Sequence, residues 1–311
     1  MKPTARILFI TVLVLTGAVF LYSAYTKLYP VELLEYTLVG MGIANWTVAE
    51  YLARILIGVE FFLAIALLTN WNFKKFTFRA TFLLLAIFSI YLIYLLITKG
   101  NKGDCGCFGT ALQMNPFEGL LKNIGLMVLL IVVRPFWSGW RMRYDNIAAT
   151  LVCITALTLP FILNPPNSIV PPPASLTAHY TFPMQLLYND SKNAAPTVNL
   201  HEKKWLVAFF SLTCPHCRIA AKKLAILHKM HPTWNFYMVL NGKDEDVQSF
   251  FDDTQTEGIT HQMFTGPSGF LQMTGGQWPA IYWMNNGVVE RKSTYQNLDE
   301  TQLTTWFAHA E

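Results

Sequence analysis

The sequence predicts an α-helical membrane bundle followed by a separate α/β domain, and two observations lead to this. Of the 311 residues, 53% are hydrophobic and only 14% are charged, whereas soluble domains carry about 25% charged residues. The long uncharged stretches lie in the first half, while the chain after residue 195 alternates charged and apolar segments. The formal net charge of +4 is small and spread over loops and helix ends, so it gives no reason to propose nucleic acid binding.

Five apolar stretches are long enough to cross a bilayer, which takes roughly 20 mostly apolar residues. They begin at Ile7, Tyr51, Phe78, Phe117 and Ile147. The fourth is the least regular, because Glu118 and Lys122 lie in its first turns. We expect a four-helix membrane domain over residues 1–146 and a fifth transmembrane helix over 147–163. The first stretch could instead be a cleaved signal peptide, but its apolar run is long and no A-x-A site follows it.

The distribution of Lys and Arg predicts the orientation, because these residues favour cytoplasmic loops. They precede the first stretch and lie between the second and third and between the fourth and fifth, while residues 29–50 carry only acidic charges. We therefore expect a multi-pass protein of the bacterial inner membrane with a cytoplasmic N-terminus. The loop over 103–110 and the chain after residue 164 would then lie in the periplasm, although Lys99 and Lys102 count mildly against this.

The segment Asn164–Ser175 is rich in proline, which favours extended, semi-rigid chain, so we assign residues 164–195 to a linker and lead-in. The domain over 196–311 begins with a buried strand from Trp205 and a helix from Cys217. Further strands are expected from Trp234, Pro279 and Val288, and further helices from Lys243 and Leu298. An Asn-Gly turn separates the last two strands, as in a hairpin.

The motif Thr-Cys-Pro-His-Cys over 213–217 lies between a predicted strand and a predicted helix. Unpaired N–H groups and the positive end of the dipole at a helix N-terminus stabilise a thiolate. We predict that Cys214 is a nucleophile, that Cys217 resolves the mixed disulfide and that His216 adds positive charge. A structural disulfide is one alternative. A zinc site is the other, but neither His201 nor His228 makes a convincing second ligand pair.

A second pair, Cys105 and Cys107, lies in the segment GDCGCFGT between two apolar stretches. A disulfide needs Cα atoms about 4.4 to 6.8 Å apart, which alternate residues reach only where the backbone bends, and Gly106 and Gly109 permit that bend. So small a ring would be strained and therefore oxidising, which suits electron exchange. The alternatives are two free thiols or a partial metal site. Nearby histidines to complete a metal site are lacking, so we expect no metal.

Ionisable residues inside membrane spans are costly and often functional. Arg54 and Lys27 would lie near the outer ends of their helices, where positive charge could favour a thiolate or hold a quinone oxygen. Arg54 is the candidate quinone ligand. Alternatively both side chains snorkel to the headgroups, which is the better explanation for Lys27. Glu60 could relay a proton or hydrogen-bond a neighbouring helix, and Cys153 would behave as a small hydrophobic residue.

Residues 196–311 resemble a thioredoxin-like domain, and Cys-Pro-His-Cys is the active-site sequence of DsbA-type disulfide oxidants. This resemblance implies that Pro279 is the cis-proline facing Cys214. Trp278 departs from the pattern, because Thr or Val is usual before that proline. The long segment from Cys217 to Pro279 is closer to the TlpA-like branch, which keeps a reductive role open.

The segments AYTKL, ARILIGVE and DCGCFGT resemble the MauE branch of the DoxX-like membrane proteins over about residues 7–133. The arrangement also parallels VKOR- and DsbB-type proteins, which oxidise a thioredoxin-like partner and pass electrons to quinone; this parallel is an analogy. It implies ubiquinone or menaquinone as a cofactor, thiol-containing extracytoplasmic proteins as partners, and the lipid bilayer as surroundings.

Together these patterns predict a membrane thiol:disulfide oxidoreductase. Electrons would pass from substrate thiols to Cys214 and Cys217, then to Cys105 and Cys107, and then to quinone. Two alternatives remain open. The relay could run outward and deliver reducing equivalents for maturation of a periplasmic partner, or the chain could be a non-enzymatic MauE-type assembly factor.

Overall fold

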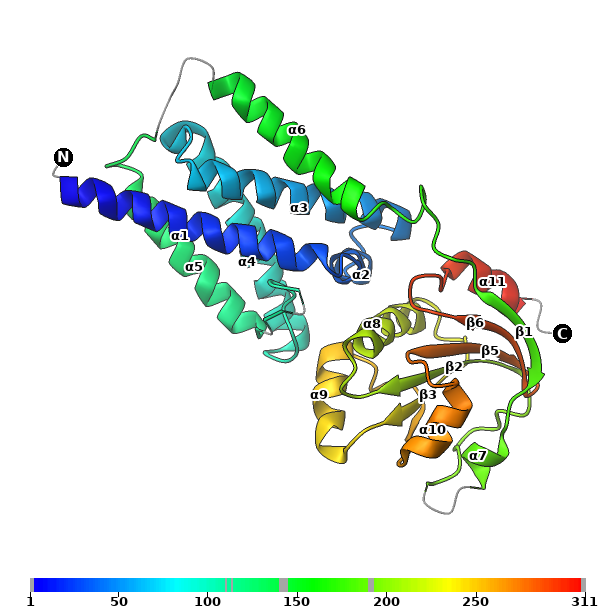
Figure 1. The fold of residues 1–311 in the computed structure, drawn as a ribbon. Helices are drawn as coiled ribbons and strands as arrows, with labels where there is room; N and C mark the ends of the chain where they lie inside the picture. Colours follow the sequence, from blue (N-terminus) through cyan, green and yellow to red (C-terminus); the bar gives the residue numbers. More distant parts are fainter. Residues whose placement is uncertain (1–2, 110, 113, 140–144, 190–192, 309–311) are drawn as a thin grey trace. The chain divides into compact units, whose positions relative to one another are not determined.

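The computed structural model describes residues 3–109, 111–112, 114–139, 145–189 and 193–308 (Figure 1). The chain divides into two compact units, Met1–Ile169 and Val170–Glu311. The first is helical, and the second is built on a mixed β-sheet. This is the predicted fold class.

The first unit contains five helices long and apolar enough to span a membrane, among the described residues. They are α1 (Pro3–Leu28), α3 (Trp46–Leu68), α4 (Phe78–Lys99), α5 (Pro116–Val133) and α6 (Asp145–Leu163). A π-helical turn, η1 (Phe73–Thr77), leads into α4. The five helices coincide with the five predicted stretches.

Small residues let the long helices approach closely. A Cβ added at Gly17 of α1 would lie 2.9 Å from Leu68 Cγ and 3.0 Å from the Ala64 carbonyl of α3. A Cβ at Gly58 of α3 would lie 2.8 Å from Leu157 Cα of α6. Glycine at these positions allows backbone-to-backbone packing, as is common between membrane helices. In the bundle α3 therefore packs against both α1 and α6 (Figure 1).

Two features of this unit differ from the expectation. A short helix, α2 (Glu32–Gly40), lies in the loop before α3, where no element was predicted. Glu118, which makes the fourth apolar stretch irregular, is a capping residue: its carboxylate accepts from Asn115 N, and Asn115 Oδ1 accepts from Glu118 N. This capping box starts α5 and stabilises its N-terminus.

The second unit is a six-stranded sheet in the order β1-β6-β5-β2-β3-β4. Its strands are β1 (Leu176–Thr181), β2 (Lys204–Ser211), β3 (Phe236–Asn241), β4 (His261–Met263), β5 (Ala280–Asn285) and β6 (Val288–Ser293). Its helices are α7 (Gln185–Tyr188), α8 (Pro215–Met230), α9 (Asp244–Thr254), α10 (Pro267–Thr274) and α11 (Glu300–Ala308). The pairs β2–β3 and β3–β4 are parallel, and the others are antiparallel.

Helices cover both faces of the central strand β2, which explains its continuous apolar run. On one face Phe209 packs against Phe270 of α10. On the other, Phe210 packs against Phe250 of α9, while Trp306 of α11 packs against the β5 residue Trp283. A central β3-β2-β5-β6 sheet with a helix directly after β2 is the predicted thioredoxin-like arrangement.

The α/β unit begins earlier than the predicted boundary at residue 196. Strand β1 pairs with β6, and Phe182, Met184 and Leu187 are buried in the core of this unit. All of them fall within the segment 164–195 that the sequence assigns to a linker and lead-in. The alternation that normally reveals a strand is absent, because five of the six β1 residues are exposed. Strand β4 and helix α10 are also additions to the predicted elements.

Candidate functional site: two thiol pairs

The first thiol pair lies where β2 passes into α8. Cys214 is the N-cap of α8, in extended conformation (φ −79°, ψ 120°), and Pro215 occupies the first helical position. The Cys214 N–H donates to the Ser211 carbonyl (3.2 Å). Arg218 Nε donates to the Leu212 carbonyl (3.1 Å), which holds the connection between strand and helix. The thiol of residue 214 therefore lies at a helix N-terminus, as predicted.

The two thiols of this pair have different environments. Cys217 is fully buried and accepts a hydrogen bond from Ser211 N (3.4 Å), while Cys214 is half-buried. The pKa of Cys214 is lowered to about 6, first by a hydrogen bond with the Cys217 thiol and then by the backbone N–H groups of Cys217 and His216, against the opposing effect of burial. Burial is the main cause that raises the pKa of Cys217. These environments support Cys214 as nucleophile and Cys217 as resolving thiol.

The other predicted residues of this site surround the same helix end. The Trp278–Pro279 peptide bond is cis. Because Ala280 pairs with Phe209, Pro279 lies beside the end of β2 that leads to Cys214. His216 is exposed, and its ring stacks on Tyr295 with centroids 6.4 Å apart. Trp278 is 40% exposed and packs on Phe270.

The second thiol pair lies in the loop between α4 and α5. Cys105 N donates to the Met114 carbonyl (2.8 Å), and Asp104 Oδ1 accepts from both Gly106 N and Met114 N, each at 3.2 Å. Gly106 has φ +71°, a conformation that favours glycine. The loop is therefore bent at Gly106, as predicted, and its two ends are joined through Asp104.

Both sulfur atoms of this pair lie against a glycine of α5. A Cβ added at Gly119 would be 3.1 Å from Cys105 Sγ and 3.2 Å from Cys107 Sγ. A Cβ at Gly109, which has φ +54°, would be 2.3 Å from the Thr26 carbonyl, so the loop also touches the C-terminal end of α1. Sequence reasoning missed Gly119. The available signal was a glycine in the first turn of the helix that follows the cysteine loop.

The thiols of this pair are also inequivalent. Cys105 is buried, and Cys107 is half-buried. The pKa of Cys107 is lowered to about 7, first by a hydrogen bond with the Cys105 thiol and then by the ammonium groups of Lys122 and Lys27, against burial and Asp104. The same thiol–thiol hydrogen bond and burial raise the pKa of Cys105. Cys107 is therefore the thiol that forms the thiolate.

Lys27 corrects one expectation, because it does not snorkel. Its Nζ lies 2.5 Å from Glu60 Oε1, and both residues are buried. Lys27 Nζ also donates to Ser23 Oγ (2.9 Å), and Ser23 Oγ donates to the Cys107 carbonyl (3.0 Å). Glu60, for which two roles were open, therefore makes a buried ion pair between α1 and α3.

Arg54, the candidate quinone ligand, is held by contacts within the bundle. It is 2% exposed. Its Nη1 donates to Glu35 Oε1 and the Glu50 carbonyl, Nε to the Asn164 carbonyl and Nη2 to the Pro165 carbonyl. The guanidinium group thus ties α2 and the end of α6 to α3.

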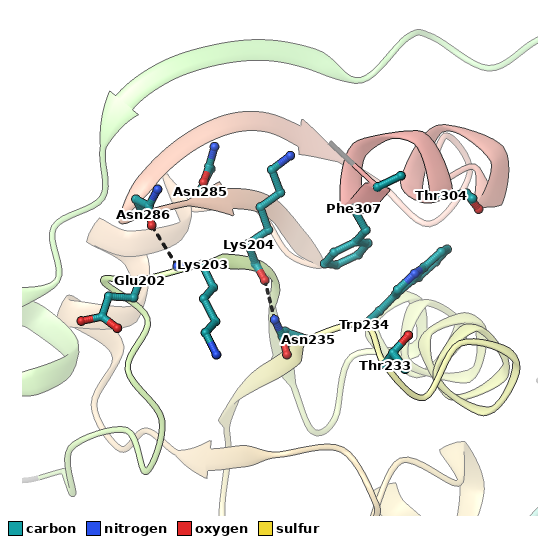
Figure 2. Close-up of a pocket in the computed structure, with 11 residues that line it drawn as sticks. Glu202, Lys203, Lys204, Thr233, Trp234, Asn235, Asn285, Asn286, Thr304 and Phe307 are labelled. Atoms are coloured by element: carbon teal, nitrogen blue, oxygen red, sulfur yellow. Dashed lines mark hydrogen bonds between the residues drawn. The ribbon is translucent and has the colours of Figure 1, made fainter. Parts of the chain in front are cut away.

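The remaining features lie outside these sites. Cys153 is half-buried on α6. Within the described residues, no group of three or more His, Cys, Asp or Glu is arranged to hold a metal ion. A groove on the α/β unit is lined by Lys204, Trp234 and Phe307, among others (Figure 2). It lies at the start of β2, opposite the strand end that leads to Cys214, so it is not part of the thiol site.

The N-terminal part of the chain matches a known family, and most of the chain is similar to a known protein. Residues 5–135 match the family described as methylamine utilisation protein MauE. The chain is also similar to Protein TlpB of Flavobacterium psychrophilum, with 26% identity over 329 aligned positions that cover 89% of this chain and 88% of that protein.

Solved structures that are similar to this chain cover between 34% and 45% of it. One is a secreted Mycobacterium tuberculosis disulfide oxidoreductase, with 18% identity and a TM-score of 0.26 over 34% of this chain and 81% of that one. Another is a thiol:disulfide interchange protein from Bacteroides sp., with 15% identity and a TM-score of 0.32 over 45% of this chain and 93% of that one.

The predicted MauE resemblance is thus confirmed, while the wider DoxX relationship stays a prediction. The order of the sheet and the position of Cys214 at the start of α8 identify the second unit as thioredoxin-like. Residues 5–135 thus resemble the MauE family, and the chain is similar to Protein TlpB along most of its length.

Proposed function

We propose that the chain relays electrons between its two thiol pairs, from substrate thiols to Cys214 and Cys217 and then to Cys105 and Cys107. One observation carries this proposal: each pair combines a thiol of lowered pKa with a buried partner of raised pKa. A thiolate is needed for thiol–disulfide exchange, whereas a purely structural disulfide has no use for one.

The first exchange oxidises the substrate. A substrate thiolate attacks Sγ of Cys214 in the Cys214–Cys217 disulfide, and Cys217 leaves and takes up a proton. A second substrate thiolate attacks the substrate sulfur of this mixed disulfide and releases Cys214 as the thiolate. The substrate loses two electrons and forms a disulfide, and the thioredoxin-like unit gains both electrons.

The second exchange transfers these electrons to the membrane domain. The Cys214 thiolate attacks one sulfur of the Cys105–Cys107 disulfide, forms a mixed disulfide with it and displaces the other sulfur as a thiolate. Cys217 loses its proton and attacks Sγ of Cys214, which restores the Cys214–Cys217 disulfide and releases the second sulfur of the membrane pair, which takes up the proton. Both electrons now reside on the Cys105 and Cys107 dithiol.

Two arguments favour this direction. The thiolate of Cys214, with its pKa near 6, stabilises the reduced form of its pair and makes the corresponding disulfide oxidising. A disulfide between residues 105 and 107 would close a very small ring, and strained disulfides have higher potentials. Electrons are therefore expected to flow toward the membrane pair.

The membrane topology that we propose places both pairs on the periplasmic side of a bacterial inner membrane. Asn164 Nδ2, at the start of the linker, donates to the Leu28 carbonyl (3.1 Å), and Gly109 packs on Thr26. The cysteine loop and the start of the linker therefore lie at the same end of α1, and the Lys and Arg distribution favours the other end for the cytoplasm.

We further propose a membrane quinone as the final acceptor, without assigning a binding residue. The test uses the full chain, purified in detergent and reduced, to which a ubiquinone or menaquinone analogue is added. Quinone reduction that accompanies thiol loss and disappears in Cys105→Ser is the expected result. If no reaction occurs and Cys214 and Cys217 are mostly reduced in cells, the relay runs outward. If Cys105→Ser and Cys107→Ser both retain full cellular function while deletion of the bundle abolishes it, the chain acts as an assembly factor.

A further inference from the structure

We propose that the buried pair Lys27 and Glu60 sets the reactivity of Cys107: Lys27 supplies a fixed positive charge to the thiolate, and Glu60 limits that charge. The two residues are positioning residues and do not exchange electrons. The inference deepens the proposed function, because it rests on Cys107 being a redox thiol.

The geometry connects the pair to the cysteine loop. Lys27 lies in the last turn of α1 and Glu60 in the middle of α3, with Nζ and Oε1 2.5 Å apart. Ser23, one turn before Lys27, accepts from its Nζ and donates to the Cys107 carbonyl. The ammonium group also lies 4.7 Å from the centroid of the Phe88 ring. The charge of Lys27 is thus held on the side of α1 that carries the loop.

Stability alone does not account for this pair. Removing two charges from water costs several kcal/mol each, and well-packed apolar residues of similar size are often as stable as a buried ion pair or more stable. Charged residues inside membrane spans are for this reason rare and are commonly functional. The nearby thiolate gives Lys27 a function that an apolar residue could not supply.

Charged and titratable groups face Cys107 from every element packed around it. They are Lys27 of α1, Glu60 of α3, Tyr91 of α4, Asp104 and Cys105 of the loop, and Lys122 of α5. Two ammonium groups favour the thiolate, and Asp104 opposes it. Glu60 is joined to the loop through its neighbours, because it pairs with Lys27 and accepts from Ser23 Oγ (3.4 Å), which also donates to the Cys107 carbonyl.

This arrangement predicts effects of opposite sign from the two partners. Lys27→Met removes a positive charge and should raise the pKa of Cys107. Glu60→Gln leaves the ammonium uncompensated and should lower it. If the pair only held the helices together, both substitutions would shift the pKa of Cys107 in the same direction, because either one would loosen the same contact.

The experiment measures the alkylation of Cys107 by iodoacetamide as a function of pH in the reduced full chain, with peptide mass spectrometry to resolve each cysteine. The wild-type midpoint should lie near 7. We expect the pH midpoint of Cys107 alkylation to be higher by about one pH unit in Lys27→Met and lower by about half a pH unit in Glu60→Gln, as for the loss of a charge near a thiolate. Shifts of the same sign, or no shift in either variant, would overturn the proposal.

The other buried ion pair of this unit provides a matched control. Arg54 and Glu35 are similarly buried and join α3 to α2. Glu35→Gln should leave the Cys107 profile unchanged. If Lys27→Met does not fold, the double variant Lys27→Met with Glu60→Met removes both charges and should give a midpoint about half a unit above the wild-type value, since the loss of the ammonium outweighs the loss of the carboxylate. A double variant with the wild-type midpoint would also contradict the proposal.

This readout requires no electron transfer, so it is separate from the test of the relay. If Cys105→Ser retained full activity, the relay would fail while the alkylation profiles still stood. If the relay were active but the two variants shifted the midpoint in the same direction, only the inference about Lys27 and Glu60 would fail.

Discussion

The two thiol pairs reach the same chemical state by different physical means. At both sites the partner thiol, Cys217 or Cys105, is the main group that stabilises the thiolate. In the thioredoxin-like unit, backbone N–H groups at the start of α8 add to this effect at Cys214. In the membrane domain, the ammonium groups of Lys122 and Lys27 take the place of the helix end. The order along the chain is also reversed, because Cys214 is the first cysteine of its pair and Cys107 the second.

The comparison shows which site depends on particular side chains. Backbone N–H groups belong to α8 itself and persist through most substitutions there. The charges around Cys107 come from side chains on two different helices, and both sulfurs lie against one glycine. The membrane site should therefore be the more sensitive of the two to single substitutions outside the cysteines.

The largest effect should come from the nucleophile itself. Cys214→Ser should lower the rate of substrate oxidation by on the order of 10³-fold or more, as for loss of a covalent nucleophile. Cys217→Ser cannot form the disulfide that oxidises substrate, so it should lose this activity as well; with a model protein that already carries a disulfide, its Cys214 thiolate should form a mixed disulfide that accumulates, because no resolving thiol remains. Activity on a reduced model protein and non-reducing electrophoresis measure the two effects. Full activity of Cys214→Ser would remove this site from the relay.

A substitution of Gly119 should have a nearly as large effect, confined to the Cys105–Cys107 pair of the membrane domain. In Gly119→Ala the new methyl group would lie about 3 Å from both sulfurs, so the pair must move, at a cost of about 1 to 3 kcal/mol. We expect loss of the Cys105–Cys107 disulfide under oxidising conditions, with substrate oxidation by Cys214 and Cys217 unchanged in a single turnover. Mass spectrometry of the alkylated protein counts the disulfides.

Gly125→Ala is the control for this substitution. Gly125 lies on the same helix, and a Cβ there would meet nothing within 4 Å. This variant should retain both disulfides. If the two alanine variants behave alike, the close approach of the sulfurs to Gly119 is not what keeps the pair in place.

These residues also show what the sequence could and could not predict. The five spans, the run from Trp205 and the helix after Cys214 follow from long apolar or periodic patterns, which depend only on neighbouring residues. Strand β1 escaped prediction because it is an exposed edge strand, stabilised by β6 more than 100 positions later in the chain. Lys27 and Glu60 are 33 positions apart, so their pairing depends on how α1 packs on α3.

Arg54 and Gly119 illustrate the same limit within the candidate site. Sequence position predicts the depth of Arg54 in the membrane but not its four acceptors, two of which follow α6. Gly119 is in contact with two sulfurs that precede it by more than ten positions, and this contact depends on how the loop bends. The acceptors of Arg54 and the contact of Gly119 with the sulfurs therefore both depend on tertiary contacts between separate elements.

A substitution of Lys122 should have an intermediate effect, which changes the reactivity of Cys107 and leaves that of Cys214 unchanged. Lys122→Gln removes the positive charge that most strongly favours the thiolate of Cys107, so the pKa of that thiol should rise by about one unit. The thiolate is the reactive form, so alkylation of Cys107 at pH 7 should become about fivefold slower. Cys214 should keep its midpoint near 6. Lys122→Arg retains the charge and is the control; an equal loss in this variant would indicate a packing effect.

His216 should have the smallest effect, although it lies within the motif. In His216→Ala the backbone N–H of residue 216 and the hydrogen bond from Cys217 remain, and each of them lowers the pKa of Cys214 more than the imidazole charge does. We expect the midpoint to rise by less than about half a unit. Cys214 is mostly thiolate at pH 7 in either case, so alkylation must be measured between about pH 5 and 6.5. If the midpoint of Cys214 alkylation rose by more than one unit, the imidazole charge would be a main cause of the lowered pKa of Cys214. Side-chain charges would then stabilise the thiolate at both sites, and the difference between the two thiol pairs would disappear.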